Sequence, residues 1–167
     1  MMKILFLCHG NICRSPMAEF VLKDMAARAG VSDRFEIASA ATSREELGHH
    51  VNPPAVRQLA SVGIGTPDNE LGVHAKTARQ ATRADYDHYD LIICMETYNI
   101  RNALRIFGDD PEGKIHLMME YASGPTRDIE DPWYTGDYVT AYRDIKAGCE
   151  GLFRKLAPPD AYAAARQ

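Results

Sequence analysis

Cys8 and Arg14 are the residues whose types and spacing indicate the most distinctive chemistry in this sequence. They stand six positions apart in the segment CHGNICRSP, residues 8–16. A cysteine thiolate is a nucleophile, and the planar guanidinium of arginine can hold two phosphate oxygens at once. Gly10 and Asn11 lie between them and tolerate the backbone conformations of a tight loop. The spacing therefore predicts a phosphate-binding loop in which Cys8 attacks phosphorus.

Such a loop needs a strand before it and a helix after it. The continuously apolar run of residues 3–8 (KILFLC) predicts a buried strand that ends at Cys8. We expect Ser15 to cap a helix that begins at Pro16 and stops near Gly30. Loop N–H groups and the helix dipole would together bind a tetrahedral anion, and Cys8 would lie beneath it as a thiolate.

The rest of the chain repeats this alternation of short apolar runs and longer helical patterns. Such alternation predicts an α/β fold, a three-layer sandwich with a four-stranded parallel sheet flanked by helices and the phosphate-binding loop after the first strand. We expect one domain over residues 1–157 and a mobile tail over 158–167. The further strands are expected at 35–39, 91–95 and 115–118, and the further helices at 53–62, after a Thr97 cap, and from Asp137 to Leu156.

Composition narrows the class of protein. The chain has 167 residues, 25% of them charged, and a net charge of −4, which argues against a nucleic-acid-binding surface. No segment resembles a signal peptide or a membrane span, so we expect a cytoplasmic protein with no membrane partner. The four cysteines are then expected to be reduced. They are Cys8, Cys13, Cys94 and Cys149.

A carboxylate is also needed if the phosphate ester is to be hydrolysed, because the leaving oxygen must receive a proton. Asp131 is the best candidate, since Pro132 stiffens its loop and Trp133 and Tyr134 follow, able to sandwich a phenyl ring. Asp110 also precedes a proline, but it lies in a turn before the fourth expected strand. We therefore expect Asp131 to be the general acid.

The segment CHGNICRSP is similar to the signature of the low-molecular-weight protein tyrosine phosphatases. The resemblance covers about residues 3–156. It continues through SAATS (39–43), NPPA (52–55), ARQ (78–80), CMETYN (94–99) and DPWYTGD (131–137). It implies hydrolysis of phosphotyrosine through a cysteinyl-phosphate, without a metal or cofactor, by a monomer or weak homodimer that acts on phosphotyrosine-containing proteins.

The same resemblance implies roles for single residues. Cys8 would be the nucleophile, Arg14 the phosphate and transition-state clamp, and Asp131 the acid. Ser15 would steady the thiolate, and Asn11 with Ser39 would hold the loop, with His74 as a further support. Residues expected to bind substrate are His9, Gly10, Asn11, Ile12, Cys13, Arg14, Ser15, Trp133 and Tyr134. Cys13 also predicts redox sensitivity, because a nearby thiol can trap an oxidised nucleophile as a disulfide.

The sequence departs from the family pattern in two places. The family often carries an aromatic wall shortly after SAATS, where this chain has Arg44-Glu45-Glu46, so the wall is polar or comes from elsewhere. The histidine expected before ARQ is displaced by two residues to His74, and Lys76 stands at the usual position. His49 and His50 are expected to be exposed loop residues rather than metal ligands.

Other functions remain open at this point. An arsenate reductase of the same fold would need two further cysteines close together, and Cys94 and Cys149 both fall in apolar patterns. A protein-arginine phosphatase tends to carry threonine where this chain has Ile12. A non-catalytic phosphate-binding module would need no Asp131 loop. A structural zinc site at Cys8 and Cys13 lacks a second pair of ligands.

Overall fold

A four-stranded parallel sheet forms the centre of the molecule. The computed structural model describes residues 1–161. The strands are β1 (Met2–Cys8), β2 (Phe35–Ala41), β3 (Leu91–Cys94) and β4 (Ile115–Leu117), in the spatial order β2-β1-β3-β4. All three pairings are parallel, which confirms the predicted fold class.

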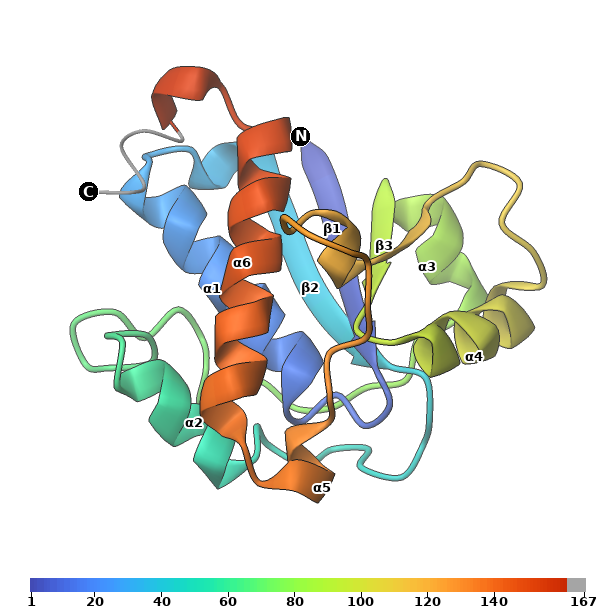
Figure 1. Ribbon diagram of the computed structural model, residues 1–167, viewed down its shortest axis with the longest axis horizontal. Coiled ribbons are helices and arrows are strands. Elements are labelled where there is room, and N and C mark those ends of the chain that lie inside the picture. The colour runs from blue at the N-terminus through green and yellow to red at the C-terminus, as the bar shows by residue number, and fades with distance from the viewer. Residues whose placement is uncertain (162–167) are drawn as a thin grey trace.

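Helices cover both faces of this sheet (Figure 1). One face packs against α1 (Arg14–Arg28), α2 (Pro53–Ala60) and α6 (Tyr138–Leu156), and the other against α3 (Arg83–His88) and α4 (Thr97–Phe107). Alternate residues of β1 divide between the two cores, with Ile4 and Phe6 in the first and Leu5 and Leu7 in the second. The continuously apolar run therefore reflects burial on both faces.

The order of the strands sets the position of the site. β1 lies between β2 and β3, and the chain leaves the carboxyl end of β1 directly into the loop that precedes α1. Ligands of open α/β sheets bind outside the carboxyl ends of the strands, where neighbouring connections diverge. The short elements η1 (Ser32–Arg34), η2 (Met118–Glu120) and α5 (Pro132–Thr135) complete the chain, and α5 lies at this same end of the sheet (Figure 1).

Two predicted helix caps are wrong. Helix α1 begins at Arg14 with Cys13 at the N-cap, because the Ser15 hydroxyl is used instead against Cys8 Sγ, at 3.0 Å. Helix α4 begins at Thr97 with Glu96 at its N-cap, since the Thr97 hydroxyl donates to Asp128 Oδ1 at 3.0 Å. In both cases the hydroxyl that the local sequence predicts to cap the helix instead forms a hydrogen bond with a side chain outside that helix.

Helix α6 lies against the chain that follows β4 with almost no space between them. A Cβ added to Gly151 would lie 1.8 Å from the backbone oxygen of Tyr121, so only glycine fits there. From this contact the chain continues to Ile129, whose N–H donates to Met95 O at 2.9 Å. This return across the end of the sheet brings Asp131 to the carboxyl end of β1.

The end of the described chain lies against the core. Ala161, which belongs to the tail predicted over residues 158–167, is 8% exposed and packs against the main core. The rest of that predicted tail, residues 162–167, lies outside the described residues. Across residues 1–161, no helix has the length and apolar character needed to cross a membrane.

Candidate active site

Cys8 lies at the bottom of the loop between β1 and α1. Its sulfur is within 3.3 Å of the backbone nitrogen of Asn11 and 3.0 Å of Ser15 Oγ. Asn11 has φ of 60°, a left-handed conformation that turns the chain tightly over the sulfur. Ser15 Oγ accepts from Asn11 Nδ2 at 2.8 Å, which leaves the serine hydrogen free to be donated to Cys8. The Cys8 sulfur thus has two hydrogen-bond donors within reach, the Asn11 N–H and the Ser15 hydroxyl.

Asn11 is held by a buried polar network. Its Nδ2 also donates to Ser39 Oγ at 2.9 Å, and Ser39 in turn donates to Glu19 Oε1 at 2.6 Å. The backbone N–H of Arg79 donates to Asn11 Oδ1 at 3.3 Å. Asn11 and Ser39, which were expected to hold the loop, are thus hydrogen-bonded to each other, and the network surrounds a backbone conformation that asparagine tolerates but does not prefer.

The prediction that His74 supports this loop is wrong. His74 Nε2 lies 3.1 Å from Gly65 O, in the turn of residues 72–76, and does not contact the network. Lys76 takes the role instead, because its Nζ donates to Ser39 O at 2.8 Å and lies 3.9 Å from Glu19 Oε1. Burial lowers the pKa of Lys76, and the carboxylate of Glu19 acts in the opposite direction.

Arg14 is the most buried charged side chain of the site, with 1% of it exposed. Nη1 donates to Ile129 O at 2.8 Å, and Nη2 donates to Glu96 Oε1 at 3.1 Å and to Asp131 Oδ2 at 3.2 Å. Burial alone would lower the pKa of Arg14, but Cys8 and the carboxylates outweigh it, and the pKa is raised. The guanidinium is thus a permanent, fixed cation beside Cys8.

Asp131 has two contacts that fix its side chain. Its Oδ1 accepts from Trp133 N at 3.1 Å, which caps α5, while Oδ2 contacts Arg14. Asp110 is used differently: its Oδ1 accepts from the Tyr86 hydroxyl and from Lys114 N, both at 2.7 Å, in the turn before β4. Of these two Asp-Pro carboxylates, only Asp131 is brought to Cys8 and Arg14.

A pocket of about 50 Å³ opens above these groups. Trp133 and Tyr134, 56% and 81% exposed, lie along its rim, and Glu45 and Glu46 line it in place of an aromatic wall. The lining residues are Cys8, His9, Gly10, Ile12, Cys13, Arg14, Glu45, Glu46, Asp131, Trp133 and Tyr134. Asn11 and Ser15, which were also expected to bind substrate, have their side chains buried behind the loop.

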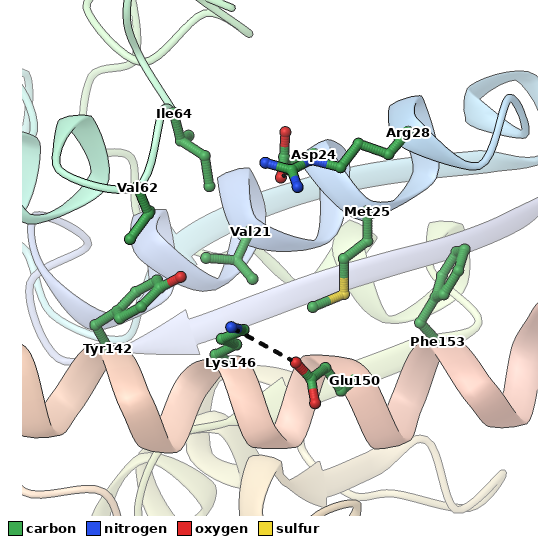
Figure 2. Close-up of a pocket in the computed structure, with 10 residues that line it drawn as sticks. All are labelled: Val21, Asp24, Met25, Arg28, Val62, Ile64, Tyr142, Lys146, Glu150 and Phe153. Atoms are coloured by element: carbon green, nitrogen blue, oxygen red, sulfur yellow. Dashed lines mark ion pairs between the residues drawn. The ribbon is translucent and has the colours of Figure 1, made fainter. Parts of the chain in front are cut away.

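A larger cavity, of about 390 Å³, lies elsewhere, between α1 and α6 (Figure 2). The charged side chains along it are paired with each other, Arg28 Nε with Asp24 Oδ2 at 2.9 Å and Lys146 Nζ with Glu150 Oε1 at 3.9 Å. None of the described residues that line it is a cysteine. The chemistry of the lining residues, rather than the volume, therefore makes the smaller pocket the candidate active site.

Cys13 has a separate environment behind the phosphate loop. It is 4% exposed, and burial raises its pKa to about 11, although a contact with the Tyr138 hydroxyl at 3.5 Å acts in the opposite direction. That hydroxyl also accepts from Asn52 Nδ2 at 2.9 Å. Cys13 is thus a neutral thiol at physiological pH, and Tyr138 links the first turn of α6 to the loop.

The sequence interpretation missed several of these residues. Glu96 is the third residue of the CMETYN segment and lies two residues beyond the carboxyl end of β3, and this position just after a strand end was an available signal. The sequence held no comparable signal for the other four residues, because each reaches the loop only through the tertiary fold. They are Glu19, Lys76, Asn52 and Tyr138. Among the described residues no group of three or more potential ligands is close enough to hold a metal, and His49 pairs with Glu46 Oε2 at 2.5 Å.

Comparison with known proteins agrees with this geometry. Residues 3–160 match the family model described as low molecular weight phosphotyrosine protein phosphatase. The chain is 33% identical to the Bacillus subtilis low molecular weight protein-tyrosine-phosphatase YfkJ, over 93% of this chain and 96% of that protein. It is 36% identical to the rat low molecular weight phosphotyrosine protein phosphatase, over 91% and 94%.

Solved structures give the same result. The crystal structure of the Streptococcus pyogenes low molecular weight protein tyrosine phosphatase superposes with a TM-score of 0.80 at 33% identity, covering 95% of each chain. The crystal structure of Bacillus subtilis YfkJ superposes with a TM-score of 0.84 at 31% identity, covering 95% of this chain and 98% of the other.

Proposed function

The chain belongs to the low molecular weight phosphotyrosine protein phosphatase family and is a protein-tyrosine phosphatase, and on this premise we propose that Cys8, Arg14 and Asp131 carry out its reaction. The observation that carries the proposal is the meeting of these three side chains at one pocket. Proteins that contain phosphotyrosine are the proposed substrates, with the phenyl ring held against Trp133 and Tyr134.

The first step transfers the phosphoryl group to sulfur. The Cys8 thiolate attacks phosphorus in line with the ester bond, so the S–P bond forms as the P–O bond to tyrosine breaks. Arg14 and the loop N–H groups neutralise the charge on the equatorial oxygens. Asp131, protonated before the step, gives its proton to the departing phenolate oxygen, and the substrate protein leaves with its tyrosine hydroxyl restored.

The second step restores the enzyme. A water molecule attacks the phosphorus of cysteinyl-phosphate, and Asp131, now a carboxylate, accepts the proton that the water loses. The S–P bond breaks, inorganic phosphate leaves, and Cys8 returns as the thiolate that the Ser15 hydroxyl and the Asn11 N–H stabilise. One carboxyl group therefore serves as acid and then as base.

Two other activities of this fold are less well supported. Ile12 lines the pocket with an apolar side chain that suits a phenyl ring and offers nothing to the guanidinium of phosphoarginine. Cys94 and Cys149 are 0% exposed, and burial raises the pKa of both thiols, so neither is placed to relay a disulfide as an arsenate reductase requires.

A substrate panel tests the proposed function. The purified protein is assayed on phosphotyrosine, phosphoserine and phosphoarginine peptides, and on arsenate with thioredoxin. We expect turnover of phosphotyrosine alone, and Cys8→Ser should lose nearly all turnover while it still binds inorganic phosphate in a calorimeter. Preferred hydrolysis of phosphoarginine would refute the substrate class, and Cys8→Ser activity within tenfold of the unmodified protein would refute the nucleophile.

We also propose one catalytic domain over residues 1–157 and a cytoplasmic location. The location is supported by the four cysteines, none of which forms a disulfide within the described residues.

A further inference from the structure

The mouth of the active-site pocket carries a charge pattern that phosphate chemistry alone does not require. Arg14 lies at the floor, and it is the one lysine or arginine among the described residues that line the pocket. Glu45 and Glu46 line the upper wall, where the family often has an aromatic residue. The pocket therefore has its one cation at the floor and carboxylates at the rim, in a chain whose net charge is already −4.

Glu46 contributes its aliphatic stem rather than its charge. A Cβ added to Gly10 would lie 3.2 Å from Glu46 Cγ, so the stem packs directly on the phosphate loop. The carboxylate of Glu46 turns to His49 Nδ1 at 2.5 Å, and this side chain is 26% exposed. The aliphatic stem of Glu46 thus forms part of the pocket wall.

Glu45 presents its charge to solvent at the rim. Its side chain is 68% exposed, and its Oε2 lies 2.9 Å from His9 Nε2. Within residues 1–161, Oε1 has no hydrogen-bond partner. A neutral histidine donates to a carboxylate without cancelling its charge, so this pair stays negative whenever His9 is not protonated.

The segment that carries Glu45 is fixed to the phosphate loop. Ser43 N and Ser43 Oγ both bond to His9 O, at 3.0 Å and 2.8 Å, and Thr42 N donates to Cys8 O at 2.9 Å. The ring of His9 stacks on Tyr98 at a centroid distance of 6.0 Å. The carboxylate is therefore held in place before substrate arrives, which lowers the entropic cost of using it.

We propose that Glu45 is a specificity-determining residue that selects phosphotyrosine segments carrying lysine or arginine next to the phosphotyrosine. When the phosphate lies on Arg14 and the phenyl ring lies between the walls, the neighbouring residue of the substrate reaches the rim. A cationic side chain there meets Glu45, whereas an acidic one is repelled. This inference rests on the proposed function and adds the class of peptide to it.

The test compares phosphotyrosine peptides of one core sequence with Lys, Ala or Glu at either neighbouring position. We expect kcat/KM for the best Lys peptide to exceed that for its Glu counterpart by about 3- to 10-fold, because exposed ion pairs contribute modestly. Glu45→Gln should bring this ratio close to one and Glu45→Lys should invert it. The readout is a ratio on one enzyme, so a general loss of activity cancels.

Glu112→Gln is the matched control. Its side chain is 63% exposed and pairs with Lys114 at 3.3 Å, in the turn before β4, at the opposite end of the sheet from the site. It makes the same change in net charge and should keep the full ratio. Raising the salt from about 0.05 to 0.5 M should shrink the ratio of the unmodified protein, since exposed charges are screened.

The outcomes separate this inference from the proposed function. Failure to hydrolyse any phosphotyrosine peptide overturns both. Hydrolysis of all peptides at equal kcat/KM overturns only the role of Glu45, as does a Lys preference that survives Glu45→Gln or is lost equally in Glu112→Gln.

Discussion

Replacing Asp131 with asparagine should abolish proton donation while leaving the loop folded. An asparagine oxygen can still accept from Trp133 N, as Asp131 Oδ1 does at 3.1 Å, and asparagine caps helices as well as aspartate does. The amide nitrogen would then face Arg14, which keeps its bonds to Ile129 O and Glu96. We therefore expect a correctly folded enzyme that lacks its acid.

The size of the loss depends on the leaving group. A general acid typically contributes about 10²–10⁴ in rate, or roughly 3–5.5 kcal/mol of barrier at 1.36 kcal/mol per tenfold. Tyrosine has a pKa near 10 and needs the proton, so kcat on phosphotyrosine should fall by about that factor. An activated aryl ester such as para-nitrophenyl phosphate leaves more readily as an anion and should lose less.

Glu96→Gln provides the matched control for Asp131→Asn. Glu96 contacts the same guanidinium nitrogen at 3.1 Å, against 3.2 Å for Asp131, so both changes weaken one carboxylate contact of Arg14. Only Asp131→Asn should show a leaving-group dependence. The measurements are steady-state kcat values on both substrates.

Equal losses in the two variants on both substrates would refute the reasoning. Asp131 would then act by positioning Arg14 and not as a proton donor. Retention of phosphotyrosine turnover within tenfold in Asp131→Asn would also exclude it as the acid.

Three further changes probe the support of the site. Ser39→Ala should cost about 1–3 kcal/mol of unfolding free energy by denaturant titration, and should lower kcat, because it removes one of the two buried acceptors of Asn11 Nδ2; unchanged kcat would mean that the network is purely structural. Gly151→Ala should lower the melting temperature by many degrees in a thermal scan, since its Cβ would overlap the Tyr121 oxygen, and an unchanged melting temperature would contradict the close packing of α6. Cys13→Ser should impair the recovery of peroxide-treated enzyme by dithiothreitol, measured as regained activity, whereas equal recovery would assign Cys13 to packing alone.

The sequence was sufficient to predict the sheet and the loop because both depend on local signals. The strand of residues 3–8 is apolar on both faces, and Asn11 stands at the loop position whose φ is positive. Lys76 and Glu96 could not be assigned in the same way. Lys76 reaches Ser39 O only through the turn of residues 72–76, and Glu96 meets Arg14 only because β3 lies beside β1.

The predictions of the two helix caps were wrong for a related reason. Ser15 and Thr97 are good capping residues in isolation, but Cys8 and Asp128 take their hydroxyls. The local pattern correctly indicated that these two hydroxyls form hydrogen bonds, but it assigned them to the helix backbone instead of to a side chain outside the helix. Where a residue can serve either the local backbone or a distant group, only the packed structure decides which it does.

The contacts of Arg14 have a consequence for how the protein is made. The two groups that hold its guanidinium from the acid loop, Ile129 O and the Asp131 carboxylate, stand 115 and 117 residues later in the chain. During synthesis from the amino terminus, β1 and the phosphate loop emerge early, but the buried cation has no partner from this loop until most of the chain has left the ribosome. The complete active site can therefore form only late in synthesis. A chain truncated before residue 129 contains the phosphate loop but lacks Asp131 and these two contacts of Arg14.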